Sequence, residues 1–210
     1  MIDLSILADP GVLLDLTLQG LVRGSMYALM GIGLSLIFGI LGIVNFAHGE
    51  LFMVGAYVMY YVISIPGVPF VAGVAAAAVA VFILGVLIER GLVEPLRRRA
   101  GREWLMDAFV LTIGLMVIMQ NGAQILFGAE RLGVPEIIPG AFSLGEIDIS
   151  YERIAIFGTA AVAVALLWAF VRFTRTGRAI RATAQNPEAA QTLGIDINRI
   201  YTIAFGIGAA

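Results

Sequence analysis

Long runs of apolar residues without formal charge alternate along the chain with short segments that hold most of the charges. Residues 24–47 carry no charge, and residues 51–88 carry none but are interrupted at 66–69 by the turn-forming sequence PGVP. A helix of about 20 apolar residues crosses roughly 30 Å of hydrocarbon. The pattern therefore predicts five complete membrane-spanning helices: one at 24–44, two within 51–88, and one each at 108–129 and 154–171.

A sixth apolar run, at residues 200–210, is too short to cross a membrane. Hydrophobic residues make up 60% of the chain and charged residues 13%, whereas soluble domains carry about 25% charged residues. The backbone inside a bilayer must satisfy its own hydrogen bonds, which favours helices. We therefore expect an all-α polytopic membrane protein. Residues 1–210 are expected to form a single transmembrane domain that is C-terminally incomplete, as part of a longer protein.

The charges of the connecting segments predict an orientation in the membrane. Residues 89–103 hold five Arg and three Glu, and residues 172–199 hold five Arg and two acidic residues. Short loops rich in arginine stay in the cytoplasm. Residues 130–153 hold two Arg and five acidic residues, and residues 1–15 hold three Asp and no basic residue, so both are expected outside. This orientation places the N-terminus outside and residues 45–50 near the inner side.

The missing residue types exclude several kinds of chemistry. The chain has no cysteine, which rules out disulfides and thiolate metal sites. All 13 basic residues are arginines, so the lysine of a GxxxxGK[ST] phosphate-binding loop is missing and the chain cannot hydrolyse ATP by that chemistry. We expect a non-enzymatic chain without a metal or cofactor of its own. The net charge of −2 gives no indication of a nucleic-acid partner.

Three polar side chains lie between apolar runs, in the sequence NFAHGE at 45–50: Asn45, His48 and Glu50. Such groups are costly in hydrocarbon unless they are paired or hydrated. If the stretch is helical, Asn45 and His48 share one face. Two interpretations stay open: the groups bind neighbouring backbone at a helix end, or they line a translocation path or form a hinge. Because histidine titrates near neutral pH, the alternative function is a proton-coupled secondary transporter of small polar solutes. An intramembrane enzyme using His48 with Ser25 or Ser35 would lack any nucleophile motif, and a metal site would lack ligands.

The segment 186–199 carries the end signals of a short surface helix. These signals are an N-cap, a first-turn proline, an acid at the positive helix end and a glycine after the C-terminus, namely Asn186, Pro187, Glu188 and Gly194. We expect a helix at 187–193 and a second helix capped by Asp196 or Asn198. A helix this short is marginal in water, so it should pack against a partner. The arginines before it are three residues apart, should follow one side of a helix leaving the membrane and can contact lipid phosphates: Arg172, Arg175, Arg178 and Arg181.

One stretch resembles the EAA motif of the permease subunits of ABC importers: EAAQTLGI at residues 188–195. The resemblance extends over nearly the whole chain to the LivH-type permeases for branched-chain amino acids. It rests also on GSMYALMGIGLSLIFGILGIVNFAHGELFMVGAY at 24–57 and on TIGLMVIMQN at 112–121, and NFAHG is its most specific part. Arg23 departs from the family pattern, which has an apolar or small residue at that position. Either a helix begins near Arg23, or its side chain faces a polar cavity.

The resemblance implies the permease subunit of an ATP-driven importer of branched-chain amino acids in the bacterial cytoplasmic (inner) membrane. The expected partners are a second, LivM-like permease subunit, two cytoplasmic ABC ATPase subunits that bind ATP and Mg, an extracytoplasmic amino-acid-binding protein, and membrane lipid. The residues expected to couple the chain to the ATPase lie in the cytoplasmic loop 172–199 and are Glu188, Ala189, Ala190 and Gly194. The candidate residues of a translocation path or hinge are Ser25, Tyr27, Asn45, His48, Glu50, Gln120 and Asn121. A zwitterionic substrate needs polar partners, and the side chains that could supply them are Ser25, Tyr27, Asn45, Thr112, Gln120 and Asn121.

Overall fold

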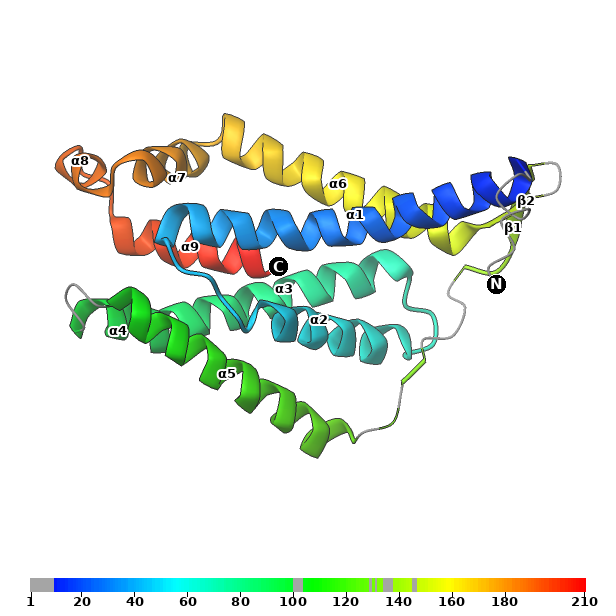
Figure 1. The fold of residues 1–210 in the computed structure, drawn as a ribbon, viewed down its shortest axis with the longest axis horizontal. Helices are drawn as coiled ribbons and strands as arrows, with labels where there is room; N and C mark the ends of the chain where they lie inside the picture. The colour runs from blue at the N-terminus through cyan, green and yellow to red at the C-terminus, as the bar shows by residue number, and fades with distance from the viewer. Residues whose placement is uncertain (1–9, 100–103, 129, 131, 134–137, 145–146) are drawn as a thin grey trace, which may run out of the picture. The chain divides into compact units, whose positions relative to one another are not determined.

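The computed structural model of the chain describes residues 10–99, 104–128, 130, 132–133, 138–144 and 147–210 (Figure 1). Nearly all of its regular structure is helical. The long helices are α1 (Pro10–Leu41), α2 (His48–Ile63), α3 (Phe70–Ile88), α5 (Trp104–Phe127), α6 (Tyr151–Phe173) and α9 (Ile197–Ala209). The shorter elements are a π-helical segment (Glu89–Val93), α4 (Glu94–Arg99), α7 (Arg175–Gln185), α8 (Pro187–Thr192) and the strands β1 (Ala141–Leu144) and β2 (Ile147–Ser150).

The expected all-α polytopic class is confirmed. Within the described residues, four helices are long and apolar enough to cross a membrane: Gly11–Leu41, Phe70–Arg99, Trp104–Phe127 and Tyr151–Phe173. The fifth expected span, α2, has 16 residues and extends about 24 Å, somewhat less than the thickness of the hydrocarbon core. Helix α9 covers the expected start of a sixth span.

The expected loop at 89–103 is helical as far as Arg99, so that part of the prediction was wrong. The π-helical segment and α4 continue α3 without a break. The physical reason lies in the apolar residues among the charges, because Val93 has no exposed surface and Leu96 packs against the buried core. Residues 100–103 lie outside the described part of the chain.

The chain folds into two compact units, and the first consists of residues 1–31 and 134–168. In it, Asp15 of α1 and Arg153 of α6 form an ion pair of 3.2 Å, and the Nε2 of Gln19 donates to the other carboxylate oxygen of Asp15 at 2.7 Å. The strands β1 and β2 form an antiparallel hairpin just before α6, which the sequence did not predict. Helix α1 begins at Pro10 and passes an exposed Arg23, so the expectation of a helix start near Arg23 was wrong.

The second unit consists of residues 32–133 and 169–210. Here α2 and α3 form an antiparallel pair, adjacent in Figure 1, around a turn in which Gly67 adopts a positive φ of 84°. Gly55 faces Val81 and Gly73 faces Ile63, a register that brings the start of α2 level with the end of α3.

Helix α9 packs antiparallel to α3 in this unit, at a point where a methyl group on Gly85 would lie 3.2 Å from the Cα of Gly206. A second close approach joins α9 to the last part of α1, where Gly208 meets Gly33. Small residues let helix backbones approach this closely, and close packing is what holds helices together in lipid. The buried core of this unit includes large apolar side chains without exposed surface: Ile37, Ile43, Leu51, Val93 and Phe205.

Candidate functional site

The short helix α8 confirms the end signals expected at 186–199. The side chain of Asn186 accepts a hydrogen bond from the backbone N–H of Ala189 at 2.9 Å, which caps the helix. Pro187 is its first residue, and Gly194 follows its end with φ of 81°. The helix ends at Thr192, one residue earlier than expected.

The two sides of α8 differ in exposure. Ala190 is buried, and its carbonyl accepts the backbone N–H of Ile195 at 3.2 Å, which fastens the connection to α9. Glu188 and Ala189 are exposed, and Leu193, directly after the helix, is 80% exposed. Helix α8 therefore turns one side toward the chain and presents an acidic and apolar side outward.

The arginine-rich segment before α8 is interrupted rather than continuous. Helix α6 ends at Phe173, and Thr174 caps the new helix α7 by accepting the backbone N–H of Gly177 at 2.9 Å. A side chain at Gly177 would overlap the carbonyl oxygens of α6, so the sharp turn requires glycine there. The expected single helix leaving the membrane was therefore wrong in its continuity, although Arg175 and Arg178 do lie exposed on α7.

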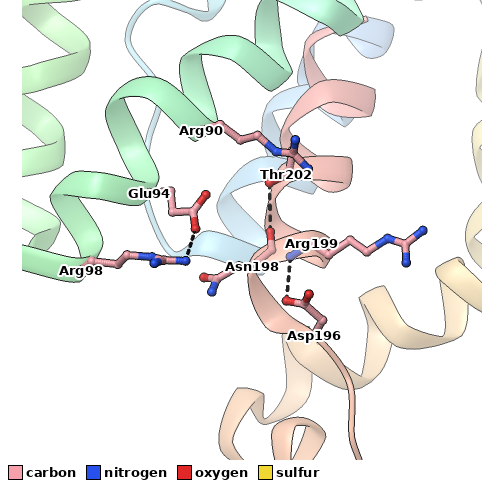
Figure 2. A pocket seen from close by; sticks show the side chains of 7 residues that line it. All are labelled: Arg90, Glu94, Arg98, Asp196, Asn198, Arg199 and Thr202. Atoms are coloured by element: carbon pink, nitrogen blue, oxygen red, sulfur yellow. Dashed lines mark hydrogen bonds and ion pairs between the residues drawn. The ribbon is translucent and has the colours of Figure 1, made fainter.

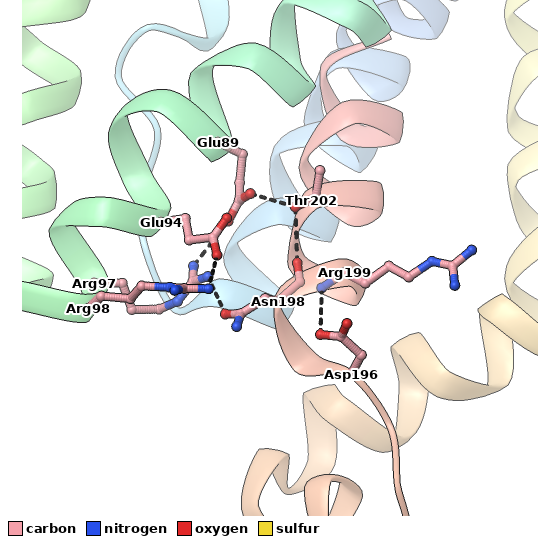
Figure 3. Close-up of polar contacts among 8 residues, drawn as sticks. All are labelled: Glu89, Glu94, Arg97, Arg98, Asp196, Asn198, Arg199 and Thr202. Carbon is pink, nitrogen blue, oxygen red and sulfur yellow. Dashed lines mark hydrogen bonds and ion pairs between the residues drawn. The ribbon is translucent and has the colours of Figure 1, made fainter.

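A buried polar cluster joins the end of the α3 span to the start of α9 (Figure 3). Glu89 has no exposed surface, and one of its carboxylate oxygens pairs with Arg97 at 3.1 Å. Its other oxygen accepts the hydroxyl of Thr202 at 2.7 Å. Arg97 also donates to the side-chain oxygen of Asn198 at 3.0 Å and lies 4.5 Å from the ring centre of Tyr201. We call these five residues the Glu89 cluster.

A cavity of about 310 Å³ lies beside this cluster and is lined by polar residues of the π-helical segment, α4 and the start of α9 (Figure 2): Arg90, Glu94, Arg98, Asp196, Asn198, Arg199 and Thr202. Both of its carboxylates are engaged. Glu94 pairs with Arg98 at 2.5 Å, and Asp196 caps α9 by accepting the backbone N–H of Arg199 at 3.1 Å. Such a lining offers no apolar pocket for the side chain of a hydrophobic amino acid.

The NFAHGE sequence forms a tight turn that leads into α2. The side-chain oxygen of Asn45 accepts the backbone N–H of Ala47 at 3.1 Å, and its carbonyl accepts the backbone N–H of His48 at 3.1 Å. Asn45 is buried outside any helix, so the helical case considered for Asn45 and His48 does not apply. Glu50 lies half-buried in the first turn of α2, where the helix dipole favours an acid.

His48 is the first residue of α2, and its side chain approaches Gly33 of α1. Its Cε1 atom lies 3.4 Å from the point that a methyl group on Gly33 of α1 would occupy, and Gly33 is the residue that meets Gly208 of α9. The imidazole therefore sits at the crossing of α1 and α9. Whether Asn45, His48 and Glu50 contact a substrate stays a prediction.

The other candidate path residues bond locally or point outward. The hydroxyl of Ser25 donates to the carbonyl of Val22, and the amide of Asn121 donates to the carbonyl of Val117, both at 2.7 Å. Thr112 is buried and bonds within its own helix in the same way. The side chains of Tyr27 and Gln120 are exposed. Bonds of this kind satisfy polar groups within a membrane helix without any substrate. A role of these residues in substrate passage therefore stays a prediction.

Sequence reasoning missed the Glu89 cluster because it counted Glu89 and Arg97 as charges of a loop. One signal was available. Glu89 directly follows the charge-free run 51–88, and apolar residues continue after it at helical spacing, as Val93 and Leu96 show. In the described part of the chain, no three His, Asp or Glu side chains come together to bind a metal.

The long apolar helices and the short capped helices between them define a polytopic α-helical membrane protein. Residues 16–210 match the family described as the permease component of branched-chain amino acid transport systems. The chain therefore belongs to this permease family, as the resemblance seen in the sequence implied.

Among curated proteins, the chain is 35% identical to the high-affinity branched-chain amino acid transport system permease protein BraD of Pseudomonas aeruginosa, over 91% of this chain and 66% of that protein. It is 32% identical to the corresponding permease LivH of Escherichia coli K12, over 91% of this chain and 65% of that protein. The chain thus spans slightly less than two thirds of the length of these relatives. No solved structure matches it.

Proposed function

We propose that the chain forms the membrane-spanning permease component of an ATP-driven importer of branched-chain amino acids in the bacterial cytoplasmic membrane. In this proposal it pairs with a second permease subunit, receives substrate from an extracytoplasmic binding protein and docks on two separate ATPase subunits, which bind ATP and Mg. Support comes from the family match and from the relatives, which are permeases of branched-chain amino acid transport systems.

The observation that carries the coupling part of the proposal is the exposed side of α8. A six-residue helix has little stability of its own, and here its ends are fixed by the caps at Asn186 and Gly194. Only one side of it packs against the chain, through Ala190. The side with Glu188 and Ala189 is open to a partner, and the neighbouring Leu193 adds an exposed apolar contact.

Contacts within the second compact unit support the proposed inner side. The two arginine-rich segments, residues 89–103 and residues 172–199, were assigned to the cytoplasm separately, from their charges. Arg97 of segment 89–103 donates a hydrogen bond to Asn198 of segment 172–199 at 3.0 Å, which requires both segments to lie on one side of the membrane. The proposal places this side in the cytoplasm, with the N-terminus outside.

The test uses the complete transporter in proteoliposomes, with Glu188→Arg and Ala189→Arg as variants, both at exposed positions of α8. A cationic side chain on the exposed side of α8 should reduce co-purification of the ATPase and ATP-driven uptake of leucine. Membrane insertion and the free energy of unfolding of the permease should stay at the wild-type level. Glu130→Arg is the matched control, because it makes the same charge change at an exposed residue of a segment assigned to the outside.

Two results would contradict the proposal. Normal ATPase binding and normal uptake in both α8 variants would remove the docking role of this helix. Uptake by the permease alone, driven by a pH gradient without ATPase subunits, would remove the ATP-driven function and favour the secondary transporter.

A further inference from the structure

Glu89 is a buried acid in a position that packing alone does not explain. A carboxylate without exposed surface costs several kcal/mol of desolvation, and an apolar side chain of similar size often packs there at least as stably. Both carboxylate oxygens of Glu89 are occupied, by Arg97 at 3.1 Å and by Thr202 at 2.7 Å. These two bonds therefore hold the Glu89 carboxylate in a defined position between its own helical run and α9.

All other contacts of the Glu89 cluster converge on the start of α9. Asn198, Tyr201 and Thr202 lie in its first two turns, and Arg97 or Glu89 contacts each of them. Helix α9 in turn begins shortly after α8. The connection between them is held at both ends, by the bond from Ile195 to the carbonyl of Ala190 and by the Asp196 cap. A displacement of α8 is therefore passed to the start of α9.

The surroundings allow the start of α9 to move more easily than its later part. One turn beyond Thr202, α9 meets α3 at Gly85 and Gly206, where a side chain on either glycine would collide with the opposite helix. Close packing of this kind resists sliding. At the start of α9, by contrast, a polar cavity of about 310 Å³ lies beside the Arg97 contacts and is lined by residues of both α4 and α9 (Figure 2).

The backbone on the other side of the contact is also unusual. Glu89 is the first residue of the π-helical segment, in which the backbone N–H of Glu94 donates to the carbonyl of Glu89. Single π-helical turns are rare inside α-helices and frequently occur at functional sites. The end of the α3 span thus departs from the α-helical hydrogen-bonding pattern at the residue that contacts α9.

We propose that Glu89 is a positioning residue that transmits the displacement of α8, through α9, to the membrane span α3. This inference rests on the proposed function, since it requires an ATPase that moves α8. Arg97 holds the carboxylate in place, and Thr202 is the contact on α9. Removing the connection should leave ATPase docking intact and reduce the transport obtained from each ATP hydrolysed.

The experiment compares four variants of the complete transporter in proteoliposomes. Glu89→Gln keeps the size of the side chain and removes its charge. Thr202→Val keeps the shape and removes the hydroxyl donor, and Thr202→Ser restores that donor. Glu94→Gln is the matched control, because Glu94 is an acid of the same helical run whose partner is the exposed Arg98.

Four quantities are measured: co-purification of the ATPase, ATP hydrolysis without substrate, thermal stability of the permease, and leucine molecules imported per ATP. For Glu89→Gln and Thr202→Val the first two should stay near wild type, while the import ratio falls about tenfold, a typical size for coupling between two sites. Thr202→Ser and Glu94→Gln should keep the wild-type ratio.

A wild-type import ratio in both Glu89→Gln and Thr202→Val would overturn the inference. Loss of uptake in both variants together with loss of assembly would also overturn it, because the cluster would then only stabilise the fold. Failure of the proposed function gives a different result, namely no ATP-driven leucine uptake by the wild-type transporter.

Discussion

The crossing of α1 and α9 is a position in the second compact unit where one added methyl group should destabilise the protein. A methyl group on Gly208 would lie 2.7 Å from the carbonyl oxygen of Gly33 and 2.7 Å from the Cγ1 of Ile37, and one on Gly33 would overlap the carbonyl oxygen of Gly208. Backbone atoms cannot rotate away as a side chain can. Relieving the overlap in Gly33→Ala therefore requires the helices to separate by roughly 1 Å.

Two opposing effects set the size of the change. Overpacking a well-packed contact costs about 1–3 kcal/mol, while replacing glycine by alanine within a helix gains up to about 1 kcal/mol. The overlap dominates at Gly33, so Gly33→Ala should lower the free energy of unfolding by about 1–2 kcal/mol. Gly39 lies on the same helix, and a methyl group there would meet no described atom within 4 Å. Gly39→Ala should therefore leave the free energy of unfolding unchanged or raise it slightly.

The assay is equilibrium unfolding of the purified permease in mixed detergent micelles containing increasing sodium dodecyl sulfate, followed by circular dichroism. The comparison between the two alanine variants cancels most effects of the detergent. Equal stability of Gly33→Ala and Gly39→Ala would refute the reasoning, since it would mean that α1 and α9 do not meet through these glycines.

The features that the sequence predicted well depend on interactions over a few residues. The caps of α8 and α9 involve bonds between residues three apart, from Asn186 to Ala189 and from Asp196 to Arg199. Chemistry at this range is visible in the sequence, because the capping residue and the backbone it serves are neighbours. The apolar runs are equally visible, since a membrane helix needs about 20 apolar residues wherever it packs.

The features that the sequence did not predict depend on residues far apart in the chain. Glu89 and Thr202 are 113 positions apart, and Arg97 and Asn198 are 101 positions apart. Charge counting treats such residues as independent, so Glu89 was assigned to a solvated loop. The same limit holds for the close contact between Gly33 and Gly208, because the many glycines of the chain look alike until the partner of each is known.

The NFAHGE sequence shows an intermediate case. Its polar residues indicated a special position, and the turn at Asn45 is local enough to be expected from an Asx motif. The place of His48 at the crossing of α1 and α9 is not local, because it depends on Gly33 and Gly208. The sequence therefore identified the candidate site, but the residues that surround it could be identified only from the three-dimensional structure.

Two further predictions concern polar side chains: the first affects the free energy of unfolding, and the second affects transport. Asp15 and Arg153 are each more than a third exposed, so Asp15→Asn should lower the free energy of unfolding by less than about 1 kcal/mol, and by less still in high salt. A larger loss that persists in high salt would mean that the pair is desolvated. His48→Gln should preserve assembly and unfolding behaviour but reduce ATP-driven leucine uptake, because the imidazole lies where α1 and α9 cross and must follow any movement of α9. Uptake equal to wild type at every pH between about 6 and 8 would leave His48 a purely structural role.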